Sequence, residues 1–143
     1  MIAEGDISLT RAEYDLLIRG HTWIRSVDPY ASLSRGWSGI FVDMLEALDL
    51  AMTEIAVERP GSHVRVIEFT TKSKFGSMRV YCGLAGVSGP PDGVWRLLRA
   101  IIDRAEERSA LTCERCGAPG RLREVDEWLM TLCDAHATLE ERP

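Results

Sequence analysis

The hydrophobic and polar positions near the N-terminus predict a helix over residues 11–19. Thr10 and Glu13 stand at the two positions of a capping box, in which each side chain accepts from the backbone amide of the other residue. Gly20 follows where helices often end in a left-handed residue. Residues 21–36 show no sustained period, and we expect them to form a polar connection.

The longest periodic segment predicts a helix from Trp37 to Glu58. Its apolar residues recur three and four positions apart, with acidic residues on the opposite face. The helix must stop before Pro60, because proline disfavours helical geometry in the residue that precedes it. We interpret the apolar stripe as core. Its members are Trp37, Ile40, Phe41, Met44, Leu45, Leu48, Met52, Ile55 and Ala56.

The next segment is rich in β-branched and aromatic residues and predicts an antiparallel hairpin. We expect strands over residues 63–71 and 77–84, joined by a turn over 72–76. Apolar and polar residues alternate in the second strand, so Met78 and Val80 share the face that packs on the helices.

A third helix is expected after Asp92, which is suited to cap it. Its apolar face would carry Val94, Leu97, Leu98, Ile101, Ile102 and Ala105. Helices that cover one face of an antiparallel hairpin define an α+β fold. We expect an α+β body over residues 1–109 and a zinc-binding module, packed on it, over 110–143.

Length and composition indicate an ordinary soluble protein. The chain has 143 residues, of which 45% are hydrophobic and 27% charged. No apolar run approaches the length that spans a bilayer, and the first residues lack the features of a signal peptide. We therefore expect a cytoplasmic protein that does not associate with membranes.

Charge is distributed unevenly along the chain. The net charge of −5 argues against binding to phosphate groups over the whole surface. Residues 1–58 hold four basic and ten acidic side chains (−6), residues 59–99 seven and two (+5), and residues 100–143 six and ten (−4). A basic middle thus lies between acidic ends, which can present two surfaces of opposite sign or simply solvated helices.

Four metal-binding residues near the C-terminus occur as two pairs, Cys113 with Cys116 and Cys133 with His136. Two residues lie within each pair and sixteen between the pairs. Thiolate and imidazole suit Zn²⁺, and Gly117 permits a tight turn behind the first pair. Three cysteines and one histidine complete a tetrahedron and leave no position open for a catalytic water. We therefore expect one structural Zn²⁺.

The segment between the two pairs predicts the type of zinc finger. Residues 120–124 and 127–132 flank a polar turn at 125–126, and the second pair would begin a helix over 133–139. A knuckle, a hairpin and a helix-borne pair follow the order of a treble-clef finger. A zinc ribbon, with both pairs on knuckles, is the alternative.

Other uses of these residues fit the sequence less well. A redox Cys-x-x-Cys needs a βαβ context, and disulfides are unusual in the cytoplasm. The zinc-deaminase and metalloprotease patterns are missing from the sequence. His21 and His63 are distant in sequence from any candidate nucleophile, so we expect no catalytic residues and no enzyme. Cys82 lies in a strand-like run and is expected to be a small buried hydrophobe.

Three sequence segments together resemble small uncharacterised bacterial and phage proteins. In that group a Gly-Trp opens a helix, a Lys-x-Lys-Phe-Gly-x-x-Arg-Val/Phe-Tyr hairpin follows, and a Cys-x-x-Cys-Gly…Cys-x-x-His module ends the chain. The resemblance covers about residues 35–137; it implies zinc binding and no particular activity. Thr71 departs from the pattern, and the first helix lies outside it. The segments are Gly36-Trp37, Lys72 to Tyr81, and Cys113 to His136.

Protein interaction is the leading functional hypothesis. Acidic helices and a small chain suit a regulator, an immunity factor or a phage-encoded inhibitor of a larger, basic host-defence protein. A nuclease or a CRISPR effector would be such a target. The acidic helix Trp37–Glu58 or the basic hairpin would then form the functional surface.

Nucleic-acid binding is the alternative hypothesis. Basic residues cluster on and near the hairpin, where Phe75 and Tyr81 are available to stack on bases. The overall acidity instead favours solvated charges with an aromatic packed inward. The candidate patch comprises Arg65, Lys72, Lys74, Phe75, Arg79, Arg121 and Arg123.

Overall fold

The structure is a computed structural model that describes residues 7–61, 63–87, 89 and 92–140. It confirms the α+β class, with helices and two antiparallel hairpins. In chain order the elements are α2 (Arg11–Ile18), the 3-10 helix η1 (Arg35–Trp37), α3 (Ser38–Glu58), β1 (Arg65–Lys74), β2 (Ser77–Ala85), α4 (Gly93–Ser109), β3 (Arg121–Val125), β4 (Trp128–Leu132) and α5 (Asp134–Glu140).

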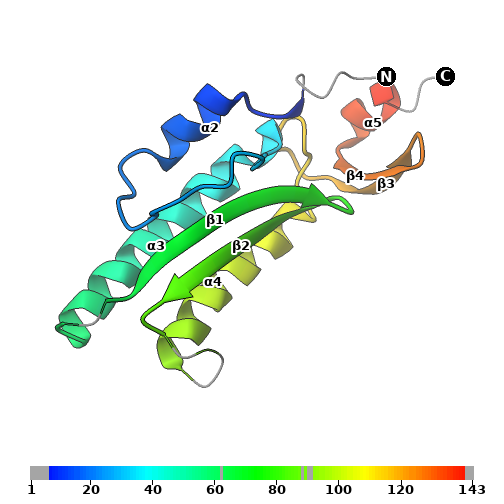
Figure 1. Cartoon of the computed structure of the whole chain (residues 1–143). Coiled ribbons are helices and arrows are strands. Elements are labelled where there is room, and N and C mark those ends of the chain that lie inside the picture. Colours follow the sequence, from blue (N-terminus) through cyan, green and yellow to red (C-terminus); the bar gives the residue numbers. More distant parts are fainter. Residues whose placement is uncertain (1–6, 62, 88, 90–91, 141–143) are drawn as a thin grey trace.

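The hairpin β1–β2 lies across helices α3 and α4, and α2 packs beside α3 (Figure 1). The second hairpin, β3–β4, and helix α5 lie beyond the turn of the first hairpin (Figure 1). We call residues 110–140, which contain these last elements, the finger. The main core fills the space between the first hairpin and the helices, and a smaller core lies inside the finger.

Helix α2 begins as the capping box predicts. The Glu13 amide donates to Thr10 Oγ1 at 3.2 Å, and the Thr10 amide donates to Glu13 Oε1 at 2.9 Å. Gly20 adopts φ +95° in the turn that follows. On its inner side the helix places the ring of Tyr14 against Phe41 of α3, with 5.6 Å between the ring centroids.

The apolar stripe of α3 is core. One residue of α3 and one residue of α4 differ from the predicted helix faces. Ala56 is exposed because Ile55 takes the inward position in the last turn. On α4, Leu97 is 41% exposed, since the row that begins with Val94 and Leu98 already fills the contact with α3 and the first hairpin. The predicted cap is present, because Asp92 Oδ1 accepts from the Val94 amide at 2.8 Å.

The first hairpin is longer than predicted, and its turn is shorter. Lys72 and Lys74 belong to β1, where Lys72 pairs with Arg79 of β2. Only Phe75 and Gly76 form the turn, with φ of +53° and +77°. A two-residue turn with positive φ at both positions matches the twist of the strands. The hydrophobic pattern ends the strand before Lys72 and Lys74, because these charged residues occupy exposed positions of β1.

Residues 21–34 follow the outer edge of β1, which the sequence pattern does not predict. The Arg25 amide donates to Val66 O and the Asp28 amide to Phe69 O, both at 2.9 Å. Isolated parallel bridges mark the same alignment at Ile24 and Val27. This irregular segment therefore protects the edge of β1 without forming a regular strand.

Side chains of α4 bind the opposite edge of the sheet. The Met78 amide donates to Ser109 Oγ at 2.8 Å, and the Val80 amide donates to Glu106 Oε2 at 2.9 Å. These acceptors take the place of a further strand along this part of β2, and they tie α4 to the hairpin.

Candidate metal centre

A tight knuckle forms the first half of the metal centre. The Cys113 amide donates to Ala118 O at 2.7 Å, and the Gly117 amide donates to Cys113 O at 3.0 Å. Gly117 adopts φ +83°, the left-handed conformation that glycine reaches without strain. The backbone therefore folds back so that Cys113 and Cys116 face the same point.

The start of α5 supplies the second half. Strand β4 delivers Cys133, the helix begins at Asp134, and the Ala137 amide donates to Cys133 O at 2.9 Å. Because α5 starts at this point, Cys133 and His136 lie on the same first turn. Arg123 of β3 stabilises the connection between β4 and α5, since it donates to Leu132 O at 3.1 Å and to Asp134 Oδ1 at 2.5 Å.

The four predicted ligands converge as a group that could hold a metal ion. Their ligand atoms all lie within 4.8 Å of one another. His136 Nδ1 is 3.6 Å from Cys113 Sγ and 3.2 Å from Cys133 Sγ, and the sulfurs of Cys116 and Cys133 are 3.8 Å apart. Cys113 is fully buried, whereas Cys116 is exposed. The centre thus lies at the edge of the finger's core.

Backbone amides of the first turn of α5 favour the thiolate of Cys133. The amide of His136 holds the pKa of this thiol below its usual value, and the neighbouring sulfurs act in the same direction. The pKa of Cys116 is raised, chiefly by desolvation. Metal binding requires deprotonated thiols, and closely spaced thiolates repel one another. A cation coordinated at this point would offset that repulsion.

The hairpin between the ligand pairs has its turn one residue later than predicted. Asp126 and Glu127 form it, with φ of +48° and +69°, and Val125 pairs with Trp128 to close it. Because acidic residues occupy both turn positions, the turn lacks the Asn-Gly or Asp-Gly sequence typical of such hairpins. Trp128 is 74% exposed at the end of the hairpin.

The knuckle is fitted directly against the start of α3. The Gly36 amide donates to Glu114 O at 2.7 Å, and the buried indole of Trp37 donates from Nε1 to Thr112 O at 2.9 Å. A Cβ atom built on Gly36 would lie 2.0 Å from Cys113 O. Only glycine permits so close an approach, which explains the Gly-Trp pair at the start of this helix.

A buried carboxylate joins the finger to β1 and to the connection that follows the edge of β1. Glu114, which is 3% exposed, accepts from Ser34 Oγ at 3.2 Å, from Ser73 Oγ at 3.3 Å and from the Thr131 amide at 2.8 Å. Burial raises the pKa of the Glu114 carboxyl, and these donors oppose the increase. Thr131 Oγ1 also donates to Gly76 O at 2.6 Å in the first hairpin's turn. The sequence gives no sign of these contacts, because their partners lie far apart along the chain.

The candidate basic patch does not form one continuous cluster. Lys72 and Arg79 face each other across the strands, and Lys74 Nζ lies 5.5 Å from the ring centroid of Phe75. Arg65 lies at the other end of β1, where it donates to His63 O at 2.8 Å. The patch therefore divides between the two ends of the hairpin.

The two arginines of β3 belong to a different face from the hairpin cations. Leu122 points toward the first hairpin, because its Cδ1 atom would lie 2.5 Å from a Cβ on Gly76. Arg121 and Arg123 alternate to the other side of the strand, where both line a hollow beside Cys133. They lie beside Cys133 of the candidate metal centre and do not extend the hairpin cluster.

His21 has a partner that its sequence position did not suggest. Its Nδ1 atom lies 2.8 Å from Asp49 Oδ1, the same oxygen that accepts from Trp23 Nε1 at 2.5 Å. The histidine thus fixes the connection after α2 to the outer face of α3. His63 is exposed.

No family model, curated protein or solved structure matches this chain. The resemblance to small bacterial and phage proteins thus rests on the sequence motifs alone. Among the described residues, no helix combines the length and the apolar character needed to cross a bilayer.

Proposed function

We propose that the centre holds one structural Zn²⁺ in a treble-clef finger. A tetrahedral zinc with bonds of about 2.3 Å to sulfur and 2.0 Å to nitrogen separates two sulfurs by about 3.8 Å and sulfur from nitrogen by about 3.5 Å. The Cys116–Cys133 and Cys113–His136 separations of 3.8 and 3.6 Å agree with these values, whereas the Cys133–His136 separation of 3.2 Å is shorter by about 0.3 Å. The order of knuckle, hairpin and helix supports the treble clef over the ribbon. With four protein ligands, the zinc stabilises the finger and offers no open position for catalysis.

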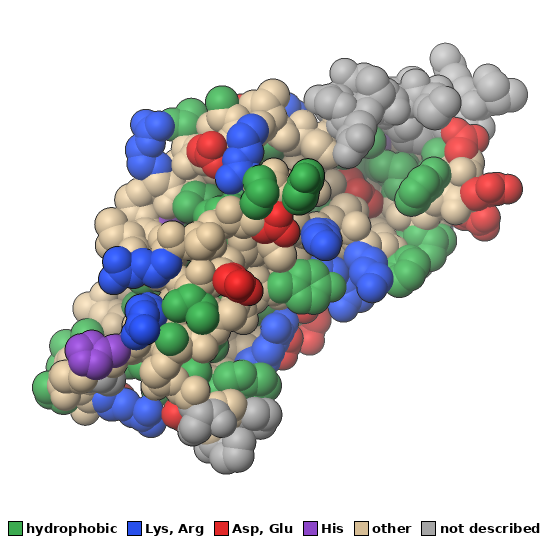
Figure 2. All heavy atoms as spheres, in the orientation of Figure 1, with side chains coloured by type: hydrophobic (Ala, Val, Ile, Leu, Met, Phe, Trp, Pro, Cys, Tyr) green, Lys and Arg blue, Asp and Glu red, His purple; other side chains and the backbone are tan. Residues whose placement is uncertain are grey.

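We propose that the chain is a non-enzymatic, zinc-stabilised protein-interaction module. The observation that carries this proposal is a set of strongly exposed aromatic side chains where the finger meets the body. Tyr30, Phe75 and Trp128 are 85%, 65% and 74% exposed. Exposed apolar side chains that gather into a patch mark protein-binding sites on soluble proteins. Figure 2 shows hydrophobic side chains gathered beside Lys and Arg at the hairpin turn and on the finger.

We call this region the junction surface. It surrounds a groove of about 560 Å³ between the finger and the body, lined in part by Tyr30, Lys72 and Trp128. Phe75 lies in the hairpin turn two residues after Ser73, which also lines the groove, and Leu129 adds an exposed apolar side chain to the lining. Aromatic anchors with flanking cations fit a protein partner that presents apolar and acidic groups.

The acidic face of α3 is less available than its composition suggests. Asp43 forms an ion pair with Arg108 of α4 at 3.1 Å, and Asp49 binds His21 and Trp23. Asp43 and Asp49 are therefore engaged in contacts within the protein and are less available to a partner. A basic partner, such as a nuclease or CRISPR effector bound by a phage-encoded inhibitor, would use the remaining acids of α3.

Site-specific variants distinguish the two surfaces. The partner is first recovered from the native host with the tagged, zinc-loaded protein, and its affinity is then measured with purified components. We expect Trp128→Ala combined with Phe75→Ala to weaken binding at least tenfold, because buried aromatic anchors typically contribute 2 kcal/mol or more. Leu50→Ala, on the exposed face of α3, is the matched control. If Leu50→Ala alone abolishes binding, the functional surface is α3 and the junction proposal is wrong.

Single-stranded nucleic acid is the second candidate ligand. It is favoured by the exposed rings of Phe75 and Tyr81 beside Lys72 and Lys74, an arrangement that permits base stacking and phosphate contact. The separation of Arg121 and Arg123 from this cluster and the net charge of −5 weigh against it.

Fluorescence anisotropy with labelled oligonucleotides tests this candidate. Binding that falls steeply with salt, and that is lost on Lys72→Ala with Lys74→Ala, would place nucleic acid first. A matched Arg11→Ala variant, on the surface of α2, should leave such binding unchanged. Absence of binding at 50 mM salt would remove the candidate.

A further inference from the structure

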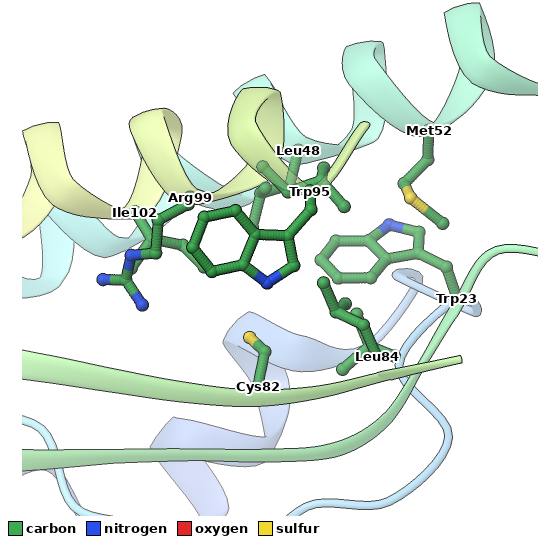
Figure 3. A pocket seen from close by; sticks show the side chains of 10 residues that line it. Trp23, Leu48, Met52, Cys82, Leu84, Trp95, Arg99 and Ile102 are labelled. Carbon is green, nitrogen blue, oxygen red and sulfur yellow. The ribbon is translucent and has the colours of Figure 1, made fainter. Parts of the chain in front are cut away.

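A second concave site lies between the helices and the hairpin, separate from the junction surface. It is a pocket of about 140 Å³ lined by side chains of α3, α4, both strands and the connection after α2. Figure 3 shows the indoles of Trp23 and Trp95 at this pocket, with Leu84 on one side of them and Met52 on the other. The remaining walls are largely aliphatic. We call it the tryptophan pocket.

We propose that the tryptophan pocket binds a small uncharged aromatic molecule. The size argument is direct, because a closed apolar cavity of about 150 Å³ in another protein stays dry and takes up benzene. A space of 140 Å³ therefore suits a single ring with few substituents. Trp23 and Trp95 offer aromatic surfaces against which such a ring can pack face to edge or offset.

The lining carries no charge that would recruit an ion. Arg99 is the charged residue at the rim, and it is already paired with Asp103 at 2.8 Å and Glu106 at 3.1 Å. Cys82 points from β2 toward Trp95 (Figure 3), and burial raises its pKa to about 12, so it remains a neutral thiol. A charged ligand would lose its hydration here without gaining a free counter-ion.

The walls are held in place before any ligand arrives. The indole of Trp23 is fixed by its hydrogen bond to Asp49, and Glu106, which holds Arg99, also accepts from the Val80 amide of β2. Leu98 and Ile102 of α4 are buried in the floor. Such preorganisation lowers the entropic cost of binding and favours a defined small ligand over loose hydrophobic contact.

Fluorine NMR tests this site with fluorobenzene as the probe and the zinc-loaded full chain as the receptor. We expect a dissociation constant on the order of 1 mM or tighter, with saturation transfer from the indoles of Trp23 and Trp95. The anion 4-fluorobenzoate and the cation 4-fluorobenzylammonium should bind at least about tenfold more weakly, because neither finds an unpaired counter-charge.

Two neighbouring leucines of α4 provide the variant and its control. Leu98→Phe fills the pocket and should abolish fluorobenzene binding, whereas Leu97→Phe adds the same ring on the exposed side of the helix and should not. Cys82→Ala enlarges the pocket and should admit 1-fluoronaphthalene, which gives a second readout if Leu98→Phe does not fold.

Several results would overturn the assignment. They are failure of the wild-type protein to bind fluorobenzene up to its solubility, equal binding of 4-fluorobenzoate, and binding that a folded Leu98→Phe variant retains. The small-molecule site is also refuted if the pocket does not bind fluorobenzene but its lining residues become protected from solvent when a protein partner binds. In that case a side chain of the partner occupies the pocket. None of these results depends on the junction surface.

Discussion

Gly36→Ala should detach the finger from the start of α3. The added Cβ would lie 2.0 Å from Cys113 O and 2.6 Å from the carbonyl carbon of Glu114. The first distance is about 1.4 Å short of the 3.4 Å at which ordinary contacts begin. Both neighbouring atoms belong to backbone held in the metal knuckle, so no side-chain rotation can relieve the overlap. The knuckle or η1 must move.

The cost follows from the contacts that this movement breaks. Overpacking of a close contact destabilises by about 1–3 kcal/mol. The displacement also lengthens the bond from the Gly36 amide to Glu114 O or that from Trp37 Nε1 to Thr112 O, each worth about 0.5–1.5 kcal/mol. We expect a loss of about 2–4 kcal/mol, which in a chain of this size lowers the midpoint of thermal unfolding by roughly 6–12 °C.

Gly39→Ala is the matched control. A Cβ at Gly39 would meet no atom within 4 Å, and the residue lies in the first turn of α3, where alanine is the better helix former. Circular dichroism of the zinc-loaded variants should show an unchanged or higher midpoint for Gly39→Ala and a lower one for Gly36→Ala. Hydrogen exchange of the amide at position 36 should accelerate in the Gly36→Ala variant. Midpoints within about 2 °C of each other would refute the close approach.

Three further predictions concern the metal, an exposed carboxylate and a buried hydroxyl. Cys116→Ser should abolish binding of the proposed zinc and leave the finger open to proteolysis, because structural zinc contributes on the order of 10–16 kcal/mol, whereas Cys82→Ser should retain zinc by elemental analysis. The hydrogen bonds of Glu13 to Arg35 and to the cap lower its pKa to about 2, so carbon NMR should show this carboxylate still ionised at pH 4. Its contribution to stability is therefore complete above about pH 4.5 and is lost as the pH falls toward 2; Arg35→Met should return the pKa toward 4.5, and an unchanged titration would contradict the pairing. Tyr14→Phe should lower the free energy of unfolding in urea by about 0.5–1.5 kcal/mol, because the Tyr14 hydroxyl lies 3.0 Å from the buried hydroxyl of Thr71. A smaller loss would show that this hydrogen bond does not stabilise the fold.

The elements that sequence predicts well are those with local signals. The Thr10–Glu13 capping box and the cap at Asp92 each depend on residues within three positions of one another, and both occur as expected. The four residues of the candidate metal centre are predictable for a related reason, since the chemistry of metal binding restricts both their identity and their spacing. Such features need no knowledge of distant segments.

The features that sequence misses depend on contacts between distant segments. The connection after α2 follows β1 through backbone hydrogen bonds, which leave no periodic pattern in its side chains. Glu114 looks like one more exposed acid until the structure places Ser34, Ser73 and Thr131 around it. The exposed position of Leu97 likewise depends on where α4 meets the sheet and not on its own hydrophobicity.

The same long-range contacts explain why the proposed zinc would control partner binding without touching the partner. Cys113, one of the proposed ligands, directly precedes Glu114, and Glu114 receives donors from β1 and β4, the strands on either side of the junction groove. Loss of zinc would release the knuckle, and with it the fixed spacing between Phe75 of the first hairpin and Trp128 of the second. Chelation should therefore abolish binding to the junction surface while fluorobenzene still enters the tryptophan pocket, which is built entirely from residues before the finger. Partner binding that survives complete zinc removal would show that the two aromatic anchors do not need to be held by the same scaffold.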